Sequence, residues 1–496
     1  MTPPAIISIT PVLASLVSLL AVIPIILLGG RANLREGASF VAGIVKFGLI
    51  ASMLPTIMAG STIEYTLWEI VPNLAIAFRV DALGMIFGLV ASSLWIITTL
   101  YSIGYMRGLK EHAQTRFFSY FSVSLAATIG VAFSANLFTL FLFYEMLSLA
   151  TYPLVTHHQD KEARSGGRTY LTYLLTASIL FVLPSLIYIF IKTGGGLDFV
   201  AGGFLEGHVG GTEALVLLIL LTFGFAKAGI MPLHSWLPAA MVAPTPVSAL
   251  LHAVAVVKVG VFCILRVYSG VFGIEFLSDL NLGTIVTWIA AFTVVVSSLI
   301  ALTQDNLKRR LAFSTIGQLS YIVLGMALLT PKGVTGSMMH IAMHAWGKIT
   351  LFFCAGAIFQ ATGKKYISEM VGIGKRMPVT MAAFFIGSLS VIGIPLAGGF
   401  WSKLYLLWGT VEDGRFTMLV VLLTSSLLNA AYFFPIAFRA FFCKPEDSRF
   451  EAKVEEAHPC AVVALSLTAV VTMLLFIYPE PFFALADTAT QHLMNR

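Results

Sequence analysis

The stretch KAGIMPLHSWLPAAMVAPTPVSALLHAVAVVKVGV, residues 227–261, decides how this chain folds. Lys227 and Lys258 lie in an otherwise apolar run, and Gly229 and Pro232 follow the first lysine closely enough to break or bend a helix. An ionisable side chain at the centre of a membrane helix costs roughly 2.5–3.5 kcal/mol, which argues that it is kept for function. The stretch therefore predicts a broken membrane helix followed by a helix with a buried lysine.

The rest of the chain extends the same pattern. Its 496 residues are 58% hydrophobic and only 11% charged, which excludes a water-soluble globular protein. About 20 apolar residues span a bilayer, and such segments follow one another with short polar gaps. We predict an all-α polytopic membrane protein of about fourteen helices, at 6–28, 37–59, 81–105, 117–134, 136–156, 169–191, 214–237, 246–269, 283–303, 311–329, 335–360, 379–408, 417–438 and 459–482.

The cationic residues of the loops predict the orientation. Of the 30 lysines and arginines, 19 fall on one side of the predicted membrane, and that side should be cytoplasmic. They are Arg31, Arg35, Arg107, Lys110, Arg116, Lys161, Arg164, Arg168, Lys308, Arg309, Arg310, Lys364, Lys365, Lys375, Arg376, Arg439, Lys444, Arg449 and Lys453. We expect a multi-pass protein of the inner (cytoplasmic) cell membrane with both termini on the non-cytoplasmic side.

The cysteines and the net charge point to no cofactor. Four isolated cysteines without a CxxC pair predict neither a disulfide framework nor a metal cluster. The net charge of +6 resides in the loops and not in a basic domain, so we expect no nucleic-acid partner. We also expect no resident metal.

Six lysine and arginine residues lie inside the apolar segments, and one acid, Glu145, lies deep in another. Lys46 and Arg266 are close to polar flanks, and we interpret them as snorkelling side chains. The other five would together cost roughly 12–18 kcal/mol, comparable to the net stability of a whole domain. These five, which we assign to function, are Glu145, Lys227, Lys258, Lys348 and Lys403.

A second broken helix is predicted near Lys403. Gly393, Ile394, Pro395, Leu396 and Trp401 repeat the residue types of Gly229, Ile230, Pro232, Leu233 and Trp236. Two interrupted helices with one lysine each are typical of an internally repeated transporter whose ion sites lie at the breaks.

The histidines fall into three groups. His340 and His344 form one helical stripe with Lys348, at i, i+4 and i+8, and we favour a proton relay over zinc because no third ligand is near. His234, beside the first break, and His252 are additional candidates for the relay. We expect the remaining histidines to be solvated in loops or in the tail: His112, His157, His158, His208, His458 and His492.

Lysine suits a proton path because its charge is easily tuned. Burial disfavours the ammonium form, and a nearby carboxylate favours it. A glutamate and a lysine whose spacing changes can therefore load and release a proton. Ser314, Gln318, Ser320 and Tyr321 could hold water between charged stations, or could simply hold helices together.

At these residues the chain resembles the antiporter-like subunits shared by respiratory complex I, Mrp sodium/proton antiporters and energy-converting hydrogenases. The stretches that carry the resemblance are residues 227–261, FLFYEMLSL at 141–149, LKRRLAFSTIGQLSYIVLG at 307–325 and GIPLAGGFWSKL at 393–404. The resemblance implies fourteen helices and two inverted five-helix repeats with helices 7 and 12 broken. The implied divisions are 1–115 for helices 1–3, 116–270 for helices 4–8, 271–440 for helices 9–13, and 441–496 for a loop and helix 14.

The resemblance also implies roles for the buried residues. Glu145 and Lys227 match a paired glutamate and lysine, Lys258 the centre of the channel, and Lys403 its exit. His340, His344 and Lys348 match the link between two half-channels. Lysine at position 403, where some members carry glutamate, favours similarity to the D-type member of the Mrp antiporters and to other lysine-bearing members over one complex I subunit.

The function we expect is proton translocation within a multisubunit sodium/proton antiporter, with other membrane subunits as partners. Whether sodium crosses this chain stays open, although a lysine-rich path suits protons better. One alternative is the same role in a redox-driven complex, either an NADH-quinone oxidoreductase or a membrane-bound hydrogenase. A less favoured alternative is a transporter whose lysines bind an anionic solute.

Overall fold

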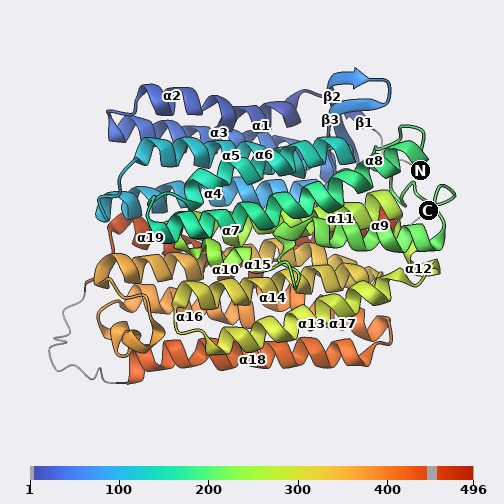
Figure 1. Cartoon of the computed structure of the whole chain (residues 1–496). Coiled ribbons are helices and arrows are strands. Elements are labelled where there is room, and N and C mark those ends of the chain that lie inside the picture. Colours follow the sequence, from blue (N-terminus) through green and yellow to red (C-terminus); the bar gives the residue numbers. More distant parts are fainter. Residues whose placement is uncertain (1–4, 444–454, 495–496) are drawn as a thin grey trace.

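The computed structural model describes residues 5–443 and 455–494, which form a bundle of helices lying side by side (Figure 1). Each of the fourteen predicted segments overlaps a helix or a broken helix. Ten helices in the described part of the chain are long and apolar enough to cross a membrane, and two further apolar helices are shorter. Lys444, Arg449, Lys453 and most of the loop near 440–458 lie outside the described residues.

The first half of the bundle runs as far as the helix that carries Lys258. Its helices are α1 Thr10–Leu20, α2 Val22–Leu27, α3 Ala32–Met58, α4 Ala82–Gly108, α5 Gln114–Ala132, α6 Leu137–Val155, α7 Lys161–Ala177, η1 Ser178–Val182, α8 Leu183–Lys192, α9 Gly211–Gly224, η2 Ala226–Ala228, α10 Trp236–Ala239, η3 Ala240–Val242, η4 Val247–Ala255, α11 Val256–Val267 and η5 Tyr268–Phe272.

The second half begins with a short connecting helix. Its helices are α12 Ile274–Asp279, α13 Leu282–Thr303, α14 Leu307–Ala327, α15 Pro331–Thr362, η6 Ile367–Met370, η7 Ile373–Lys375, α16 Pro378–Ile392, α17 Gly399–Glu412, α18 Phe416–Phe442, α19 Pro459–Ile477 and α20 Glu480–Met494. The segment predicted at 459–482 is thus two helices and not one, because Tyr478 leaves the helical conformation ahead of α20.

A small sheet, absent from the sequence prediction, covers one end of the bundle. Strands β1 (Ala5–Ile7) and β2 (Thr62–Val71) pair in parallel, and β2 pairs antiparallel with β3 (Leu74–Val80). β2 is rich in β-branched and aromatic residues, which favour a strand. Asn73 makes the tight turn at a positive φ of 67°, which asparagine tolerates better than most residues. This end of the bundle also holds both termini (Figure 1).

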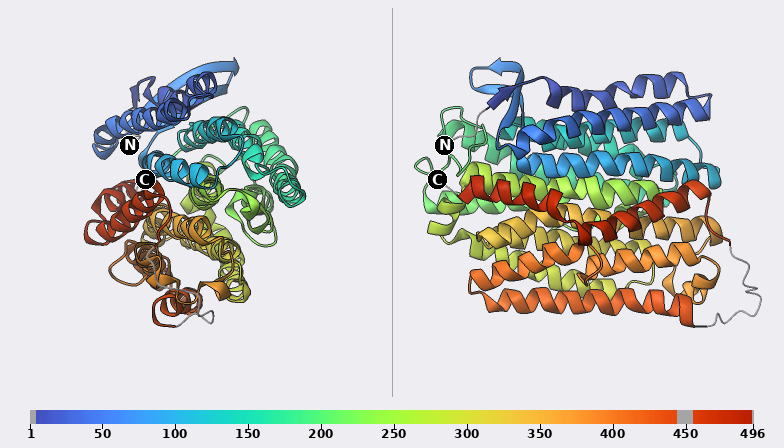
Figure 2. Two further views of the ribbon diagram at one scale, coloured as in Figure 1. Left: turned by 90° about the vertical axis from the view of Figure 1, so that its left-hand side faces the viewer. Right: turned by 180° about the vertical axis from the view of Figure 1, so that it is seen from behind.

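Two helices form the centre of the bundle. The most apolar windows of the span 247–272 and of α15 are both 100% buried, whereas the other candidate spans are less enclosed. Viewed along the bundle, the two halves of the chain lie on opposite sides, and the last helices return to lie between them (Figure 2). A helix buried on all sides should be apolar throughout, yet these two carry His252, Lys258, His340, His344 and Lys348.

Candidate functional site: a row of buried lysines and histidines

Lys227 lies in the break of the first broken helix. After α9 ends, the 3-10 turn η2 holds Lys227, and Gly229 then takes a positive φ of 70° that glycine adopts without strain. The Lys227 ammonium turns to α6 and donates to the carbonyl of Tyr144 at 2.9 Å and to the hydroxyl of Ser148 at 2.6 Å. It also lies 3.0 Å from the centre of the Tyr144 ring, a cation–π contact.

Glu145 lies on α6 with Tyr144 and Ser148, but it makes no hydrogen bond to Lys227. Its oxygen Oε1 is buried and has no hydrogen-bond partner among the described residues, and no ion pair joins the carboxylate to Lys227, although its charge acts on the ammonium. A buried acceptor without a donor costs free energy. The sequence placed Glu145 beside Lys227 but gave no sign that Tyr144 and Ser148 would bind the ammonium.

Lys258 begins the central part of the site. Its Nζ donates to the carbonyl of Ala253 at 2.6 Å and to Nδ1 of His344 at 2.6 Å. Ala253 lies in η4, a π-helical segment; such segments are frequent at functional sites. The main chain of Lys227 packs directly on α11, the helix of Lys258. The approach is so close that a Cβ added to Gly260 would meet the carbonyl carbon of Lys227 at 2.3 Å.

The stripe on α15 continues from His344 to His340. Their rings stack with centroids 5.5 Å apart and planes at 15°. The two nitrogens of His340 are both engaged, Nδ1 with the Ser402 hydroxyl at 2.8 Å and Nε2 with Oε1 of Gln318 at 3.0 Å. In contrast, Nε2 of His344 is buried without a partner. Two members of the predicted stripe, His344 and His340, thus form one row of contacts with Lys258.

Lys348, the third member of the stripe, points to a different neighbour. Its Nζ donates to the hydroxyl of Ser314 on α14 at 2.7 Å, and Ser314 in turn accepts from Tyr432 on α18 at 3.0 Å. Tyr432 is also hydrogen-bonded to Asn429. This is a side branch that leads away from the histidines towards α18.

Lys403 lies beyond the second break, in α17. Its Nζ donates to the carbonyl of Ile392, the last residue of α16, at 3.1 Å, and to the hydroxyl of Ser426 at 3.3 Å. The ammonium also lies 4.6 Å from the centre of the Tyr321 ring. Ser402, next to Lys403 in the chain, is the residue that binds His340. Lys403 is therefore adjacent to the end of the histidine row.

The two additional histidines do not join the row. His252 is fully buried in η4, and neither of its ring nitrogens has a hydrogen-bond partner in the part of the chain that the structure describes. His234 is half-buried, and its Nδ1 lies 3.2 Å from the carbonyl of Pro232. Their place in the relay stays a prediction.

The expectation that Lys46 and Arg266 snorkel is wrong. Lys46 is completely buried, and its Nζ donates to the carbonyl of Leu125 at 2.9 Å. Arg266 is also buried and forms an ion pair with Asp81, its Nη2 lying 2.9 Å from Oδ1. Tertiary partners on other helices, which the position along one segment cannot reveal, hold both cations inside.

A cavity of about 500 Å³ opens among the loops at the end of the bundle opposite the sheet. Its lining includes Tyr105, Thr245, Lys308 and Ala355, and so reaches from the loops to the start of η4 and to α15. Lys308 donates to the carbonyl of Ala243 at 2.6 Å in this lining. The cavity gives polar access from one end towards the central helices.

The arrangement as a whole is suited to moving charge and not to covalent chemistry. The charges of Lys258, Lys348, His340 and Lys403 all act on His344, and protonating one group of such a set disfavours protonation of the next. Hydrogen bonds link Lys258 to His344 and His340 to Ser402 and Gln318, whereas His344 and His340 meet by ring stacking and Lys227 meets the helix of Lys258 by main-chain packing. The geometry therefore supports a relay that runs across the helices, from α6 through α11 and α15 to α17.

Comparison with known proteins matches this chain to two family models. Residues 134–429 match the family described as NADH:quinone oxidoreductase/Mrp antiporter, TM. Residues 71–118 match the N-terminus of NADH-ubiquinone oxidoreductase (complex I) chain 5. The first match contains every residue of the row described above.

Relatives occur in more than one kind of complex. NADH-quinone oxidoreductase subunit N of Desulforudis audaxviator is 31% identical over 445 residues, covering 86% of this chain and 87% of the relative. A probable A/B component of a K⁺/H⁺ antiporter of Rhizobium meliloti is 32% identical over 74% of this chain, which spans only 37% of that relative. A chain in the structure of the Mrp complex from Dietzia sp. DQ12-45-1b has the same fold, with a TM-score of 0.84, 21% identity and coverage of 97% and 98%.

Proposed function

Because the chain belongs to the NADH:quinone oxidoreductase/Mrp antiporter family of multi-pass membrane proteins, we propose that it moves protons within a multisubunit sodium/proton antiporter. The observation that carries this proposal is the row of buried ionisable groups on the two most enclosed helices of the bundle. Such groups are expensive in a membrane interior, and a polar row across several helices is what a proton path requires.

The path begins at the first break and follows the contacts. A proton on Lys227 passes towards Lys258, whose helix packs on η2 at Gly260. From Lys258 it crosses the 2.6 Å contact to His344 and then the stacked pair to His340. Gln318 and Ser402 then connect His340 to the neighbourhood of Lys403, the exit. Lys348 and Ser314 set the charge beside the histidines.

Glu145 controls the first station. In the conformation described here Lys227 is held by Tyr144 and Ser148, and the Glu145 carboxylate is left without a partner. A shift of Lys227 towards Glu145 would favour the ammonium, and a return would favour proton release. The switch between these two positions is the coupling step that we propose.

The cavity at the loop end supplies protons from one side. Its lining includes Lys308 and Thr245, next to η4 and α15. We place this end in the cytoplasm, since most of the loop cations gather there, and both termini on the opposite side of the inner (cytoplasmic) membrane. We further propose that 116–270 and 271–440 are two inverted repeats, each with one broken helix, and that other membrane subunits complete the complex.

A second candidate function is the same proton path in a redox-driven complex. The observation that favours it is the relative in Desulforudis audaxviator, an NADH-quinone oxidoreductase subunit that this chain matches over 87% of its length. The two functions differ in what drives the path and not in the path itself. Lysine at 403 and the lysine-rich row fit either function with protons, and not sodium, crossing this chain.

Proton flux in vesicles separates the two. The native operon is expressed in an antiporter-deficient host, and a pH dye follows flux with and without a sodium gradient. Sodium-dependent flux supports the antiporter. Flux that appears only when a quinone or ferredoxin couple is supplied would replace it with the redox-driven complex, and no flux under either drive would overturn both.

A further inference from the structure

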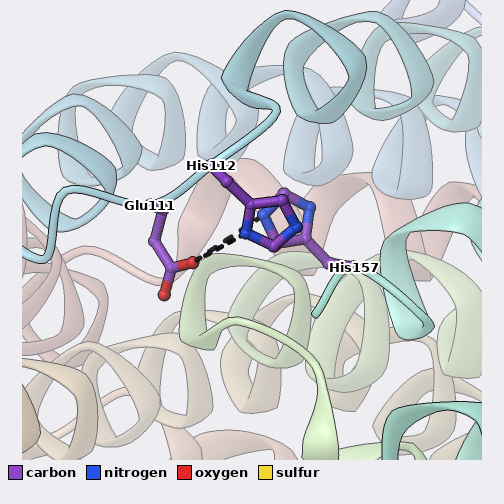
Figure 3. Close-up of side chains that lie close together, drawn as sticks. All are labelled: Glu111, His112 and His157. Carbon is purple, nitrogen blue, oxygen red and sulfur yellow. Dashed lines mark ion pairs between the residues drawn. The ribbon is translucent and has the colours of Figure 1, made fainter. Parts of the chain in front are cut away.

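A cluster of potential metal ligands lies outside the proton row, among the loops at the cavity end. Glu111 and His112 follow α4, and His157 and His158 follow α6. Figure 3 shows the Glu111 carboxylate directed at the rings of His112 and His157. From Glu111 Oε2 the distances are 3.6 Å to His158 Nδ1, 3.9 Å to His157 Nε2 and 4.0 Å to His112 Nδ1.

His157 is the member that demands an explanation. We expected it to be solvated in a loop, but its side chain is completely buried. Neither ring nitrogen makes a hydrogen bond of good geometry to any described residue, and a buried polar group without such a bond is costly. A neutral imidazole nitrogen is the group through which histidine binds metals.

The surroundings hold this ring in place without satisfying it. Arg116 donates to the main-chain carbonyl of His157 at 2.8 Å and so fixes the loop. The Phe117 ring meets the imidazole edge-on, with centroids 5.9 Å apart. Nε2 of His157 lies 3.9 Å from the Glu111 carboxylate, and the His112 and His158 rings lie beside the buried ring with centroids 4.7 Å and 5.5 Å away. The buried ring thus has three neighbours that carry lone pairs for a cation.

We propose that Glu111, His112, His157 and His158 bind a divalent transition-metal ion, with zinc as the preferred ion. Three imidazoles and one carboxylate are ligands that zinc accepts in tetrahedral sites, whereas calcium and magnesium prefer oxygen ligands alone. Ligand atoms about 2.0–2.1 Å from a tetrahedral zinc ion lie about 3.4 Å from each other. The ligand atoms of Glu111, His112 and His157 lie within 4.8 Å of one another, and Nδ1 of His158 lies 3.6 Å from Oε2 of Glu111, which is close to the spacing that a bound ion needs.

The site joins two loops that are distant in the sequence. A bound ion would hold the α4–α5 loop to the α6–α7 loop, next to the cavity, whose lining includes His158. None of the four ligands belongs to the proton row, so the site can be tested without reference to transport.

Cobalt(II) titration of the full chain in detergent, after chelator treatment, tests the proposal. Tetrahedral cobalt absorbs visible light strongly, and zinc should abolish the signal by displacing it from one site per chain. The double variant His112→Asn/His158→Asn changes the two more accessible ligands, which keeps the risk of misfolding low. It should lose the cobalt signal and bind zinc at least about tenfold more weakly.

The control is His208→Asn, an exposed histidine in the loop between α8 and α9, at the opposite end of the bundle. It should bind cobalt and zinc as the wild type does. His157→Asn should behave like the double variant when gel filtration shows it to be folded. Equal zinc affinity in the wild type and the double variant, or a wild type without the visible cobalt bands, would overturn the proposal.

Discussion

The two broken helices contain the same residue types but use them in opposite ways. At the first break, the Trp236 indole donates to the carbonyl of Ala226, within the break, and Lys227 reaches out to α6. At the second break, Lys403 reaches back to the carbonyl of Ile392, and the Trp401 indole donates to the carbonyl of Phe476 on α19. At each break, either the tryptophan or the lysine donates to a carbonyl of the broken helix, and the other of the two donates to a neighbouring helix.

The difference separates a structural role from a switching role. Helix ends leave carbonyls that need donors, and Lys403 supplies one to its own broken helix. At the first break the Trp236 indole, and not Lys227, donates to a carbonyl of the broken helix. The Lys227 ammonium binds α6 instead, where Oε1 of Glu145 has no hydrogen-bond partner among the described residues. We therefore expect function to be most sensitive at the first break and stability to be most sensitive at the second.

Glu145→Gln should have the largest effect on transport. The amide keeps the shape but cannot favour the Lys227 ammonium as a carboxylate does, so proton flux should fall about 100-fold, the scale of a lost acid–base group. Flux in vesicles and assembly of the complex on a native gel measure the two roles separately. The matched control is Glu213→Gln, an exposed carboxylate that pairs with Lys192, which should leave flux unchanged. Normal flux in Glu145→Gln would show that the switch at the first break does not exist.

Two serine variants sharpen the comparison. Ser148 accepts a hydrogen bond from Lys227 at 2.6 Å, whereas the bond that Ser426 accepts from Lys403 is longer, at 3.3 Å. A hydrogen bond to a charged group contributes about 1.5–3 kcal/mol, so Ser148→Ala should slow flux about tenfold or more. Ser426→Ala should change flux much less, since the longer bond contributes less. An equal effect of the two variants would remove the asymmetry between the breaks.

Glycine variants test stability at the breaks. Gly229 and Gly393 both have positive φ, 70° and 89°, so alanine at either costs about 1 kcal/mol or more. A Cβ at Gly393 would also meet Cδ of Lys403 at 2.5 Å, while a Cβ at Gly229 meets nothing closer than 3.6 Å. Gly393→Ala should lower the thermal unfolding temperature more than Gly229→Ala, as measured in detergent. The reverse order would contradict the structural role of Lys403.

The sequence could predict the breaks and the stripe because both are local. Gly229 with Pro232 and Gly393 with Pro395 interrupt any helix, and the spacing of His340, His344 and Lys348 places them on one helical face. The hydrogen-bond partners that come from distant segments could not be predicted. Nothing in the sequence indicated that Tyr144 and Ser148 bind Lys227, that Asp81 pairs with Arg266, or that Leu125 accepts from Lys46.

Loops and strands were the other limit of the sequence. His157 was expected in solvent because it follows a helix end, yet the packing of two loops buries it. A search for long apolar segments finds membrane helices only, and so it cannot predict the hairpin of β2 and β3. In both places the outcome depends on contacts between segments distant in the chain.

The most direct test of the account is proton flux through vesicles that contain Lys227→Ala, compared with Lys403→Ala and with the exposed control Lys192→Ala. The account predicts that Lys227→Ala assembles with unchanged thermal stability and loses cation-driven flux, while Lys403→Ala loses both flux and stability and Lys192→Ala loses neither. Intact flux in assembled Lys227→Ala would contradict the proton path from its first station onward.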